Sequence, residues 1–147
     1  MLRQWRSQSH VRWYCRYHVV IVPKYRRKAI YGVIRKQLGS IMRELCTREG
    51  IDIIEGHIRP DHVHMCLEIP PKYSIASVIG KLKGKTTMLL HQRYGRKKNF
   101  RGLNFWSRGY CVSTIGLSEA KVLEYIRDQE KADRRMDQQE QVDLFKN

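Results

Sequence analysis

The spacing of hydrophobic positions along the chain alternates between the period of strands and the period of helices. Residues 13–25 are aromatic and β-branched up to Pro23, which predicts a first strand. Over 28–49, apolar residues recur at spacings of three and four, which predicts an amphipathic helix that ends at Gly50. Residues 1–10 show no such period and are expected to form a flexible arm.

The rest of the chain repeats this alternation. Residues 51–58 and 62–69 predict two strands joined by a tight Arg-Pro-Asp turn. Residues 74–90 predict a second helix with a serine as its N-cap. A short fourth strand is expected over 110–115, and a last helix begins at Ser118.

The predicted order of elements is β-α-β-β-α-β, followed by a helix. The first six elements are those of the ferredoxin-like or RRM-like arrangement, an α+β fold in which a four-stranded antiparallel sheet carries two helices on one face. A length of 147 residues suits one domain. We therefore expect a single domain over 1–147, with an arm at 1–10 and a polar tail at 131–147.

Charge is the strongest signal in the composition. Lys and Arg number 29 against 14 Asp and Glu, which gives a formal net charge of +15 and a pI near 10.0. Most of the acids fall between Glu119 and Asp143, so the basic surface belongs to the body of the fold. Such a charge attracts a polyanion, with nucleic acid as the first candidate partner and an anionic membrane surface as the second.

Composition also excludes several classes of protein. With 41% hydrophobic and 29% charged residues, the chain is not a disordered one. The longest aliphatic run, 19–22, is far shorter than the roughly 20 residues of a membrane span, and the N-terminus lacks the apolar region of a secretory signal. The cysteines are widely separated, which indicates reduced thiols in a core rather than a zinc site. We expect a soluble, cytoplasmic protein.

Basic and aromatic side chains occur together in segments that are candidates for nucleic-acid binding. Basic groups hold phosphates and aromatic faces stack on unpaired bases, a combination typical of proteins that bind single strands or hairpins. A merely solvated surface would explain the net charge poorly. The candidate DNA-binding residues are Lys24, Arg26, Arg27, Lys81, Lys83, Lys85, Arg96, Lys97, Lys98 and Arg108, and the aromatic residues of the loop-like stretch 94–108 are Phe100, Phe105 and Trp106.

Two short motifs carry candidate chemistry. His62 and His64 alternate along one predicted strand, so both imidazoles project from the same face and could converge on one divalent metal ion. The alternative is a pair of polar side chains on a solvated face. Tyr125 and Gln129 are four residues apart, hence on one face of the last helix, which could supply a third ligand. The alternative for Tyr125 is an amphipathic residue at the rim of the core.

Other motifs of active sites are missing from the sequence. It contains no glycine-rich phosphate loop, and its acids are too few and too clustered for a two-metal nuclease held by carboxylates. Neither His57 nor His91 begins the second His-x-Ser/Thr motif that a phosphoesterase of that type would need.

A set of segments in a fixed order is recognisable between residues 12 and 130. These segments are Lys24-Tyr25-Arg26-Arg27, Pro60-Asp61-His62-Val63-His64-Met65, Ile69-Pro70-Pro71-Lys72-Tyr73-Ser74, Leu82-Lys83-Gly84-Lys85, Phe105-Trp106-Ser107-Arg108-Gly109-Tyr110, Ser113-Thr114-Ile115-Gly116 and Tyr125-Ile126-Arg127-Asp128-Gln129. The set closely resembles the single-tyrosine HUH transposases of small bacterial and archaeal insertion sequences.

The resemblance implies that His62, His64 and Gln129 hold a divalent metal, Mg²⁺ or Mn²⁺, and that Tyr125 is the nucleophile. It implies cleavage and rejoining of single-stranded DNA at insertion-sequence ends through a covalent 5′-phosphotyrosine, with recognition of subterminal DNA hairpins. It also implies a homodimer, in which the histidines of one subunit often meet the tyrosine helix of the other. Gly116 would suit a hinge before that helix.

Two alternative functions stay open on the sequence alone. A non-catalytic nucleic-acid-binding module on the same fold would account for the charge and the aromatic residues. A domesticated relative that processes DNA hairpins would need the same active site as a mobile transposase. Replication initiators and relaxases share the chemistry, but their longer chains disfavour them. We expect no membrane or small-molecule partner, and a location in the cytoplasm at the nucleoid.

Overall fold

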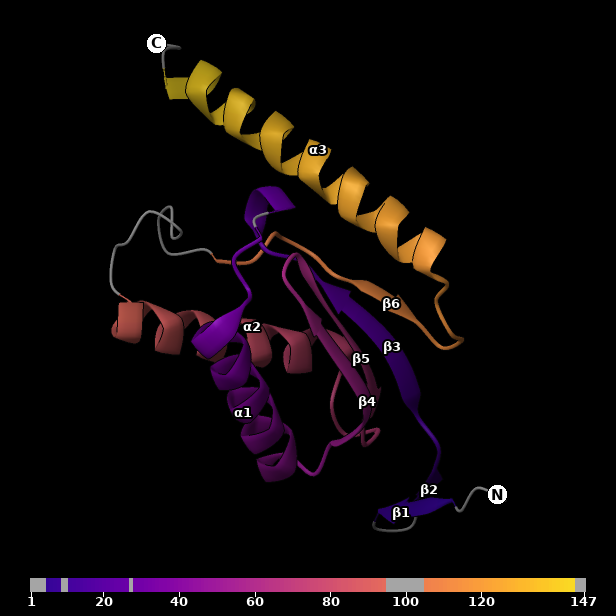
Figure 1. Cartoon of the computed structure of the whole chain (residues 1–147). Coiled ribbons are helices and arrows are strands. Elements are labelled where there is room, and N and C mark those ends of the chain that lie inside the picture. Colours follow the sequence, from indigo (N-terminus) through magenta and orange to yellow (C-terminus); the bar gives the residue numbers. More distant parts are fainter. Residues whose placement is uncertain (1–4, 9–10, 27, 95–104, 145–147) are drawn as a thin grey trace.

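The computed structural model describes residues 5–8, 11–26, 28–94 and 105–144 (Figure 1). In chain order its elements are β1 (Arg6–Gln8), β2 (Val11–Trp13), β3 (Arg16–Ile21), the 3-10 helix η1 (Lys24–Arg26), α1 (Gly32–Arg48), β4 (Asp52–Arg59), β5 (His62–Glu68), α2 (Ile75–Tyr94), β6 (Cys111–Ser113) and α3 (Glu119–Leu144). None of the helices in these residues is long and apolar enough to cross a membrane.

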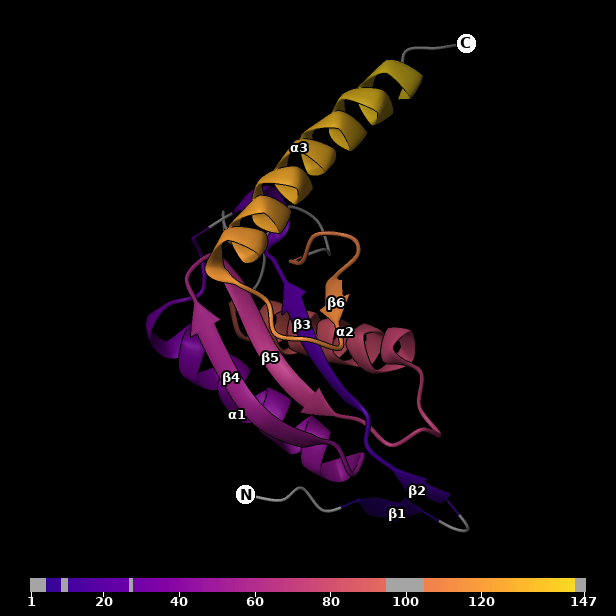
Figure 2. The ribbon, with the colours of Figure 1, turned by 90° about the vertical axis from the view of Figure 1, so that its right-hand side faces the viewer.

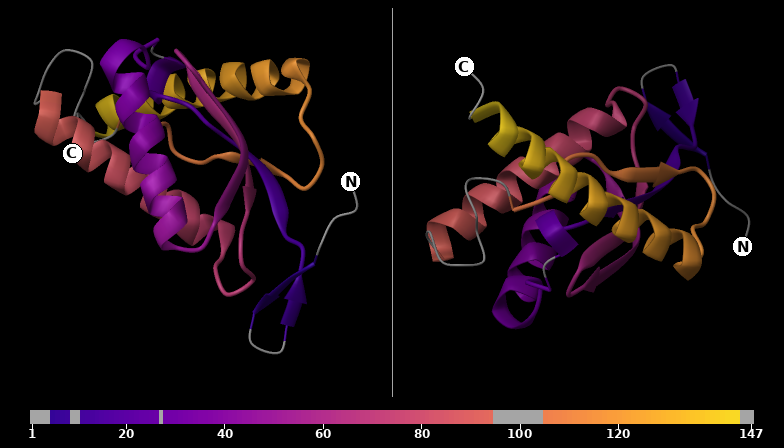
Figure 3. Two further views of the ribbon diagram at one scale, coloured as in Figure 1. Left: turned by 60° about the horizontal axis from the view of Figure 1, so that its bottom comes forward. Right: turned by 90° about the horizontal axis from the view of Figure 1, so that it is seen from above.

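The central sheet has the strand order β4-β5-β3-β6, and every pair in it is antiparallel. This is the ferredoxin-like order, so the predicted α+β fold with a four-stranded antiparallel sheet is confirmed. α1 and α2 cover one face of the sheet, whereas α3 crosses the other (Figures 2 and 3). α3 therefore covers only part of this second face of the sheet, and the rest of the face is open to solvent.

Strand β3 shows how both faces are filled. Val19 and Ile21 project into the main core with α1 and α2, whereas Val20 packs with Val122 and Ile126 of α3. All five side chains are buried. The uninterrupted apolar run in the sequence therefore belongs to a strand that is covered on both sides.

The predicted helix ends have the expected chemistry. The Ser74 hydroxyl accepts a hydrogen bond from the backbone N–H of Ser77 at 3.1 Å, so Ser74 caps α2 as predicted. Gly50 follows α1 with a φ of 70°, and its N–H donates to the carbonyl of Thr47 at 3.2 Å. The left-handed conformation explains why a glycine ends this helix.

The cysteines agree in part with the interpretation as core thiols. All four are free, Cys46 and Cys66 are buried, and Cys15 and Cys111 are half-buried. Burial raises the pKa of the Cys46 thiol to about 11, which keeps it protonated at neutral pH.

The N-terminal residues differ from the expected flexible arm. β1 pairs antiparallel with β2 to form a β-hairpin. The guanidinium of Arg6 forms an ion pair with Asp52 of β4 and lies 4.7 Å from the centre of the Trp13 ring. These long-range contacts, rather than a local period, order the segment. The strand predicted from Trp13 is accordingly divided, because Trp13 closes the β-hairpin and β3 begins at Arg16.

The last helix runs further than expected. α3 continues to Leu144, well into the range 131–147 expected to form a polar tail. Asp133 gives the physical reason, since its side chain is 1% exposed although it is charged. Its carboxylate accepts hydrogen bonds from the backbone N–H of Tyr25 at 3.1 Å and from the hydroxyl of Ser107 at 2.5 Å. The helix thus continues because its middle turns are anchored to η1 and to the segment before β6.

Replacing Asp133 by Ala should destabilise the fold by about 2 kcal/mol, because the donors of Tyr25 and Ser107 lose a buried, charged acceptor. Urea denaturation followed by circular dichroism measures the loss. The matched control is Asp137→Ala, which removes a carboxylate that lies 3.8 Å from Lys24 and is 38% exposed. Asp137→Ala should lower the free energy of unfolding by less than about 0.5 kcal/mol. Equal effects of the two variants would show that the buried network does not hold α3.

Candidate active site

Four histidines gather on the face of the sheet that α3 crosses. His57 lies on β4, His62 and His64 on β5, and His18 on β3, and all four line one cleft of about 560 Å³, here called the histidine cleft. Alternation puts them there, because Val63 between the two histidines of β5 is buried in the core. His64 is central, with its ring centroid 5.7 Å from that of His18 and 6.4 Å from that of His57.

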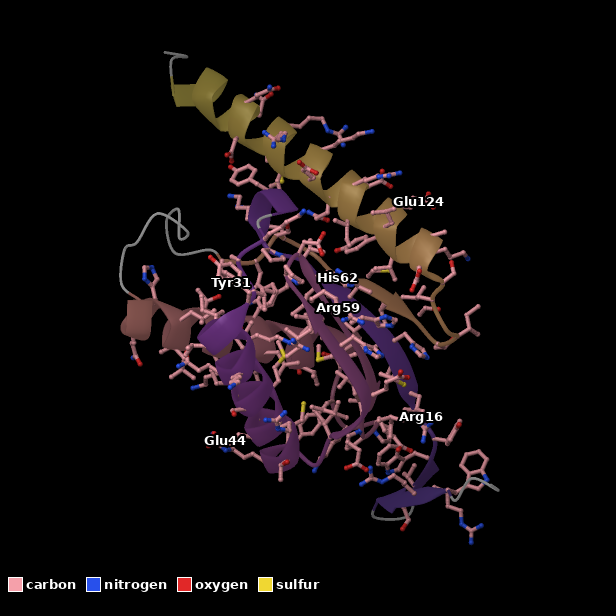
Figure 4. The ribbon with its side chains drawn as sticks, viewed as in Figure 1. Arg16, Tyr31, Glu44, Arg59, His62 and Glu124 are labelled. Atoms are coloured by element: carbon pink, nitrogen blue, oxygen red, sulfur yellow. The ribbon has the colours of Figure 1, made fainter. Side chains whose placement is uncertain are left out.

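His62 begins β5 opposite Arg59, at the end of the strand pair that lies beneath α3 (Figure 4). Asp61 orients its ring, since Asp61 Oδ1 lies 2.9 Å from His62 Nδ1. An Nδ1–H that donates to this carboxylate leaves the lone pair of Nε2 for a metal, the usual arrangement behind a ligating histidine.

His64 is held in its neutral form. Burial lowers the pKa of His64, and the neighbouring imidazoles of His18, His57 and His62 lower it further. Neutral imidazole is the form that binds a metal ion. The donor chemistry of this pair therefore fits a divalent cation.

The pair does not complete a metal site by itself. Within the described residues, no three His, Cys, Asp or Glu side chains are placed to hold one ion. A further ligand of another type is needed, such as the amide predicted at Gln129. Gln129, however, does not line the histidine cleft. It lies beside Gly109, and its Nε2 donates to Asp133 at 3.4 Å.

Tyr125 also lies outside the histidine cleft. Its side chain packs against the small apolar cluster under α3, which consists of Val20, Val22, Val122 and Ile126. Its hydroxyl is buried and has no hydrogen-bond partner among the described residues. Burial raises the pKa of the Tyr125 phenol, and Cys111 and Asp133 raise it further. In this position Tyr125 is a poor nucleophile.

One chain therefore carries two halves of the predicted site on one face of its sheet. The histidine cleft holds His62 and His64, and α3 carries Tyr125 and Gln129. The side chains that α3 contributes to the cleft are Glu119, Val122, Leu123 and Ile126. Within one chain, the structure places His62 beside His64 and Tyr125 beside Gln129, but it does not bring the two pairs into one site.

Two of the predicted DNA-binding lysines contact the protein itself. Lys83 Nζ donates to the backbone carbonyls of Ser107, at 2.8 Å, and Gly109. Burial lowers the pKa of Lys83 to about 8. Lys81 forms an ion pair with Glu49 at 3.0 Å. Lys83 thus links α2 to the segment before β6, a structural role that the sequence does not reveal.

The other predicted cations differ in their placement. Lys85 and Arg108 are exposed, and Lys24 is half-buried beside Asp137. The remaining candidates lie outside the described residues: Arg27, Arg96, Lys97, Lys98 and the side chain of Arg26.

The prediction that Phe105 and Trp106 stack on DNA bases is wrong. The two side chains are 0% and 4% exposed, and their rings meet edge-on with centroids 4.8 Å apart. The indole Nε1 of Trp106 donates to Thr86 Oγ1 at 2.9 Å, deep beside α2. A loop-like sequence does not distinguish an aromatic anchor in the core from an exposed one. Phe100 lies outside the described residues.

Sequence reasoning missed His18 and His57, which enter the histidine cleft from the strands on either side of β5. Period-two alternation indicates the face of a residue within its own strand, but not which strands are neighbours. The pairing of His57 with His64 and of His18 with Cys66 supplies that information. The ferredoxin-like strand order was the one signal that could have found them.

Comparison with known proteins identifies the family to which this chain is similar. Residues 11–129 match the family described as IS200-like transposases. The chain is 46% identical over 130 residues to the transposase for insertion sequence element IS200 of Salmonella typhimurium, which covers 88% of this chain and 86% of that protein. It is 30% identical over 115 residues to the ISDra2 transposase TnpA of Deinococcus radiodurans, covering 77% of this chain and 82% of that one.

Solved structures share the fold. A crystal structure of a Deinococcus radiodurans protein described as a transposase aligns with a TM-score of 0.73 and 26% identity, over 84% of this chain and 97% of that chain. The REP-associated tyrosine transposase bound to a REP hairpin aligns with a TM-score of 0.53 and 14% identity, over 78% and 66%, a likeness of fold alone. The family match spans most of the chain and agrees with the motifs in its sequence. The chain belongs to the IS200-like transposase family.

Proposed function

We propose that this transposase cleaves and rejoins single-stranded DNA at the ends of an insertion sequence, with Tyr125 as the nucleophile. His62, His64 and Gln129 hold a divalent cation, Mg²⁺ or Mn²⁺, in the complete site. The observation that carries the proposal is the imidazole pair on β5. One ring is oriented by Asp61 and the other is kept neutral by burial, in a cleft that the tyrosine helix crosses.

Transfer to Tyr125 conserves the energy of the phosphodiester linkage, because one P–O bond replaces another. The phenol oxygen attacks the scissile phosphorus, so an Oη–P bond forms and the P–O3′ bond breaks. The phenol proton passes to solvent and the leaving oxygen takes one up, which gives a 5′-phosphotyrosine and a 3′-hydroxyl. A 3′-hydroxyl later attacks the phosphotyrosine and releases Tyr125, without water or ATP. When bound, the cation polarises the phosphate and stabilises the charge that builds on its oxygens.

The docked position of Tyr125 supports an active site shared between two copies of the chain. A buried phenol without an acceptor has to leave this position to react. β6 is an edge strand of the sheet. Val112 on this strand and Ile115, two residues after its end, are 41% and 70% exposed, as suits a surface that a second copy covers. We therefore propose a homodimer in which α3 of one subunit, moving about Gly116, completes the histidine cleft of its partner.

A DNA hairpin is the proposed recognition element. The net charge of +15 and the exposed Lys85 and Arg108 support binding of a polyanion. The REP-associated neighbour is itself bound to a REP hairpin. We propose that this chain likewise recognises hairpins near the ends of its element.

Tyr125→Phe should abolish the SDS-resistant protein–DNA adduct, a loss of more than about 10³-fold, because the attacking oxygen is gone. The assay incubates end-labelled single-stranded DNA from the flanks of the gene with Mn²⁺ and separates the products on a denaturing gel. Tyr31→Phe, at an exposed tyrosine before α1, is the matched control and should form the adduct normally. Both variants should bind a DNA hairpin as the parent does. An adduct on the Tyr125→Phe chain would remove Tyr125 from this role, and hairpin binding without any adduct from the parent would favour a binding module.

His62→Ala should lower Mn²⁺-dependent cleavage by at least about 100-fold, because half of the imidazole pair is lost. Asp61→Asn, which only weakens the orientation of His62, should lower it about 10- to 100-fold. Calorimetric titration with Mn²⁺ should show a stoichiometric site in the parent and none in the His62→Ala protein. His91→Ala on α2 serves as the control. Unchanged metal binding in the His62 variant would overturn the ligand assignment.

Co-expression of Tyr125→Phe chains with His62→Ala chains should restore cleavage to about a quarter of the parental rate. Half of randomly assembled dimers are mixed, and one of the two shared sites in each is intact. Each variant alone should be inactive. A mixed preparation that is as inactive as its parts would place the histidines and the tyrosine of one site in the same subunit.

A further inference from the structure

The β-hairpin of β1 and β2 projects from the end of the central sheet (Figures 1 and 3). At its base, the segment that leads into β3 borders a second cleft of about 500 Å³, here called the Tyr14 cleft because Tyr14 lines it. His18, Glu55 and Cys66 line both this cleft and the histidine cleft. The two clefts therefore adjoin each other and share these three residues as a common wall.

Two aromatic side chains beside the Tyr14 cleft are open to solvent. Trp5 is 67% exposed and Tyr14 is 37% exposed. Their ring centroids lie 6.1 Å apart at an interplanar angle of 62°. Since the rings meet at a steep angle instead of stacking on each other, the indole of Trp5 stays available to a flat partner.

The β-hairpin that directly follows Trp5 is fixed to the sheet. Trp13 is 5% exposed and lies beneath the guanidinium of Arg6, which also forms an ion pair with Asp52 at the start of β4. These contacts hold Trp5 and Tyr14 in place before a ligand arrives. A site positioned in advance loses less conformational entropy when it binds.

Arg16 brings an unsatisfied donor to the same cleft. It begins β3 at the end of the sheet nearest the β-hairpin (Figure 4). Its guanidinium carbon lies 5.7 Å from the centre of the Tyr14 ring, and its Nη2 forms an ion pair with Glu68 Oε2 at 3.9 Å. Its Nε is buried and has no hydrogen-bond partner in the described part of the chain. A buried donor without an acceptor is costly, so a shift of the Arg16 side chain that brings its Nε–H to an acceptor of a bound nucleotide would recover that cost.

We propose that the Tyr14 cleft binds an unpaired base of the single strand whose scissile phosphate lies in the histidine cleft. The position of that phosphate rests on the proposed function. Trp5 and Tyr14 supply stacking surface, and Arg16 supplies the hydrogen-bond donor. A paired base has both faces covered by its neighbours in the duplex, so this site selects single-stranded DNA. Because the two clefts adjoin, a strand whose scissile phosphate lies in the histidine cleft can run on toward the β-hairpin.

Fluorescence anisotropy with two labelled probes tests the proposal. One probe is a short oligo(dT) single strand, and the other is a blunt DNA hairpin without a single-stranded tail. All chains carry Tyr125→Phe, so that cleavage has no influence on the result. Trp5→Ala and Tyr14→Ala should each weaken binding of oligo(dT) about tenfold, the usual effect of removing one stacking aromatic. Binding of the blunt hairpin should not change.

Tyr31→Ala is the matched control, because Tyr31 is 59% exposed and lies well away from Arg16 (Figure 4). Tyr14→Phe keeps the ring and should bind oligo(dT) as the parent does, which separates lost stacking from lost folding. The proposal is overturned by unchanged affinity in both Ala variants, by an equal loss in Tyr31→Ala, or by an equal loss on the blunt hairpin. If the wild-type protein fails to cleave DNA, the proposed function fails and the oligo(dT) result still decides the role of the cleft.

Discussion

The alternation of side chains along β5 couples the hydrophobic core to the candidate chemistry. Val63, Met65 and Leu67 fill the core under α1 and α2, which directs His62 and His64 to the opposite face. A shift of the pairing register by one residue would bury both imidazoles and expose the core residues. Because β5 is paired with β4 on one side and with β3 on the other, such a shift would disrupt two ladders at once. The core thus fixes the direction in which the histidine pair points.

On that same face, the stability of the single chain requires α3 to be docked on the sheet, whereas the reactivity of Tyr125 requires α3 to leave that position. The helix is held by Val122 and Ile126 against Val20, and by the buried carboxylate of Asp133. The same docking removes the Tyr125 hydroxyl from water, leaves it without a partner among the described residues, and raises the pKa of the phenol. The contacts that hold α3 on the sheet are therefore the same ones that make the Tyr125 phenol unreactive. A reactive tyrosine needs a second position for α3, which is the physical basis for proposing a shared site.

Features with a strong local period could be predicted from the sequence, and features that depend on distant partners could not. The order of the six core elements, the cap at Ser74 and the common face of His62 and His64 all follow from spacing. The N-terminal β-hairpin does not, because its strands span three residues each and depend on an ion pair with Asp52. Lys83 looked like a phosphate ligand because the sequence cannot show the carbonyls that it contacts. Burial of a charged or aromatic side chain is a property of the whole fold.

The charges around the histidine cleft bear on how it can receive DNA. The protein as a whole is strongly basic, yet among the described residues the carboxylates of Glu55, Asp61 and Glu119 line this cleft against a single guanidinium, that of Arg59. With His64 neutral, the chain's own groups repel a phosphate there while the rest of the molecule attracts the DNA backbone. A divalent cation at the imidazole pair would reverse the local sign. On the proposed function, the basic surface would therefore gather DNA without the cation, whereas entry of a phosphate into the cleft would depend on it.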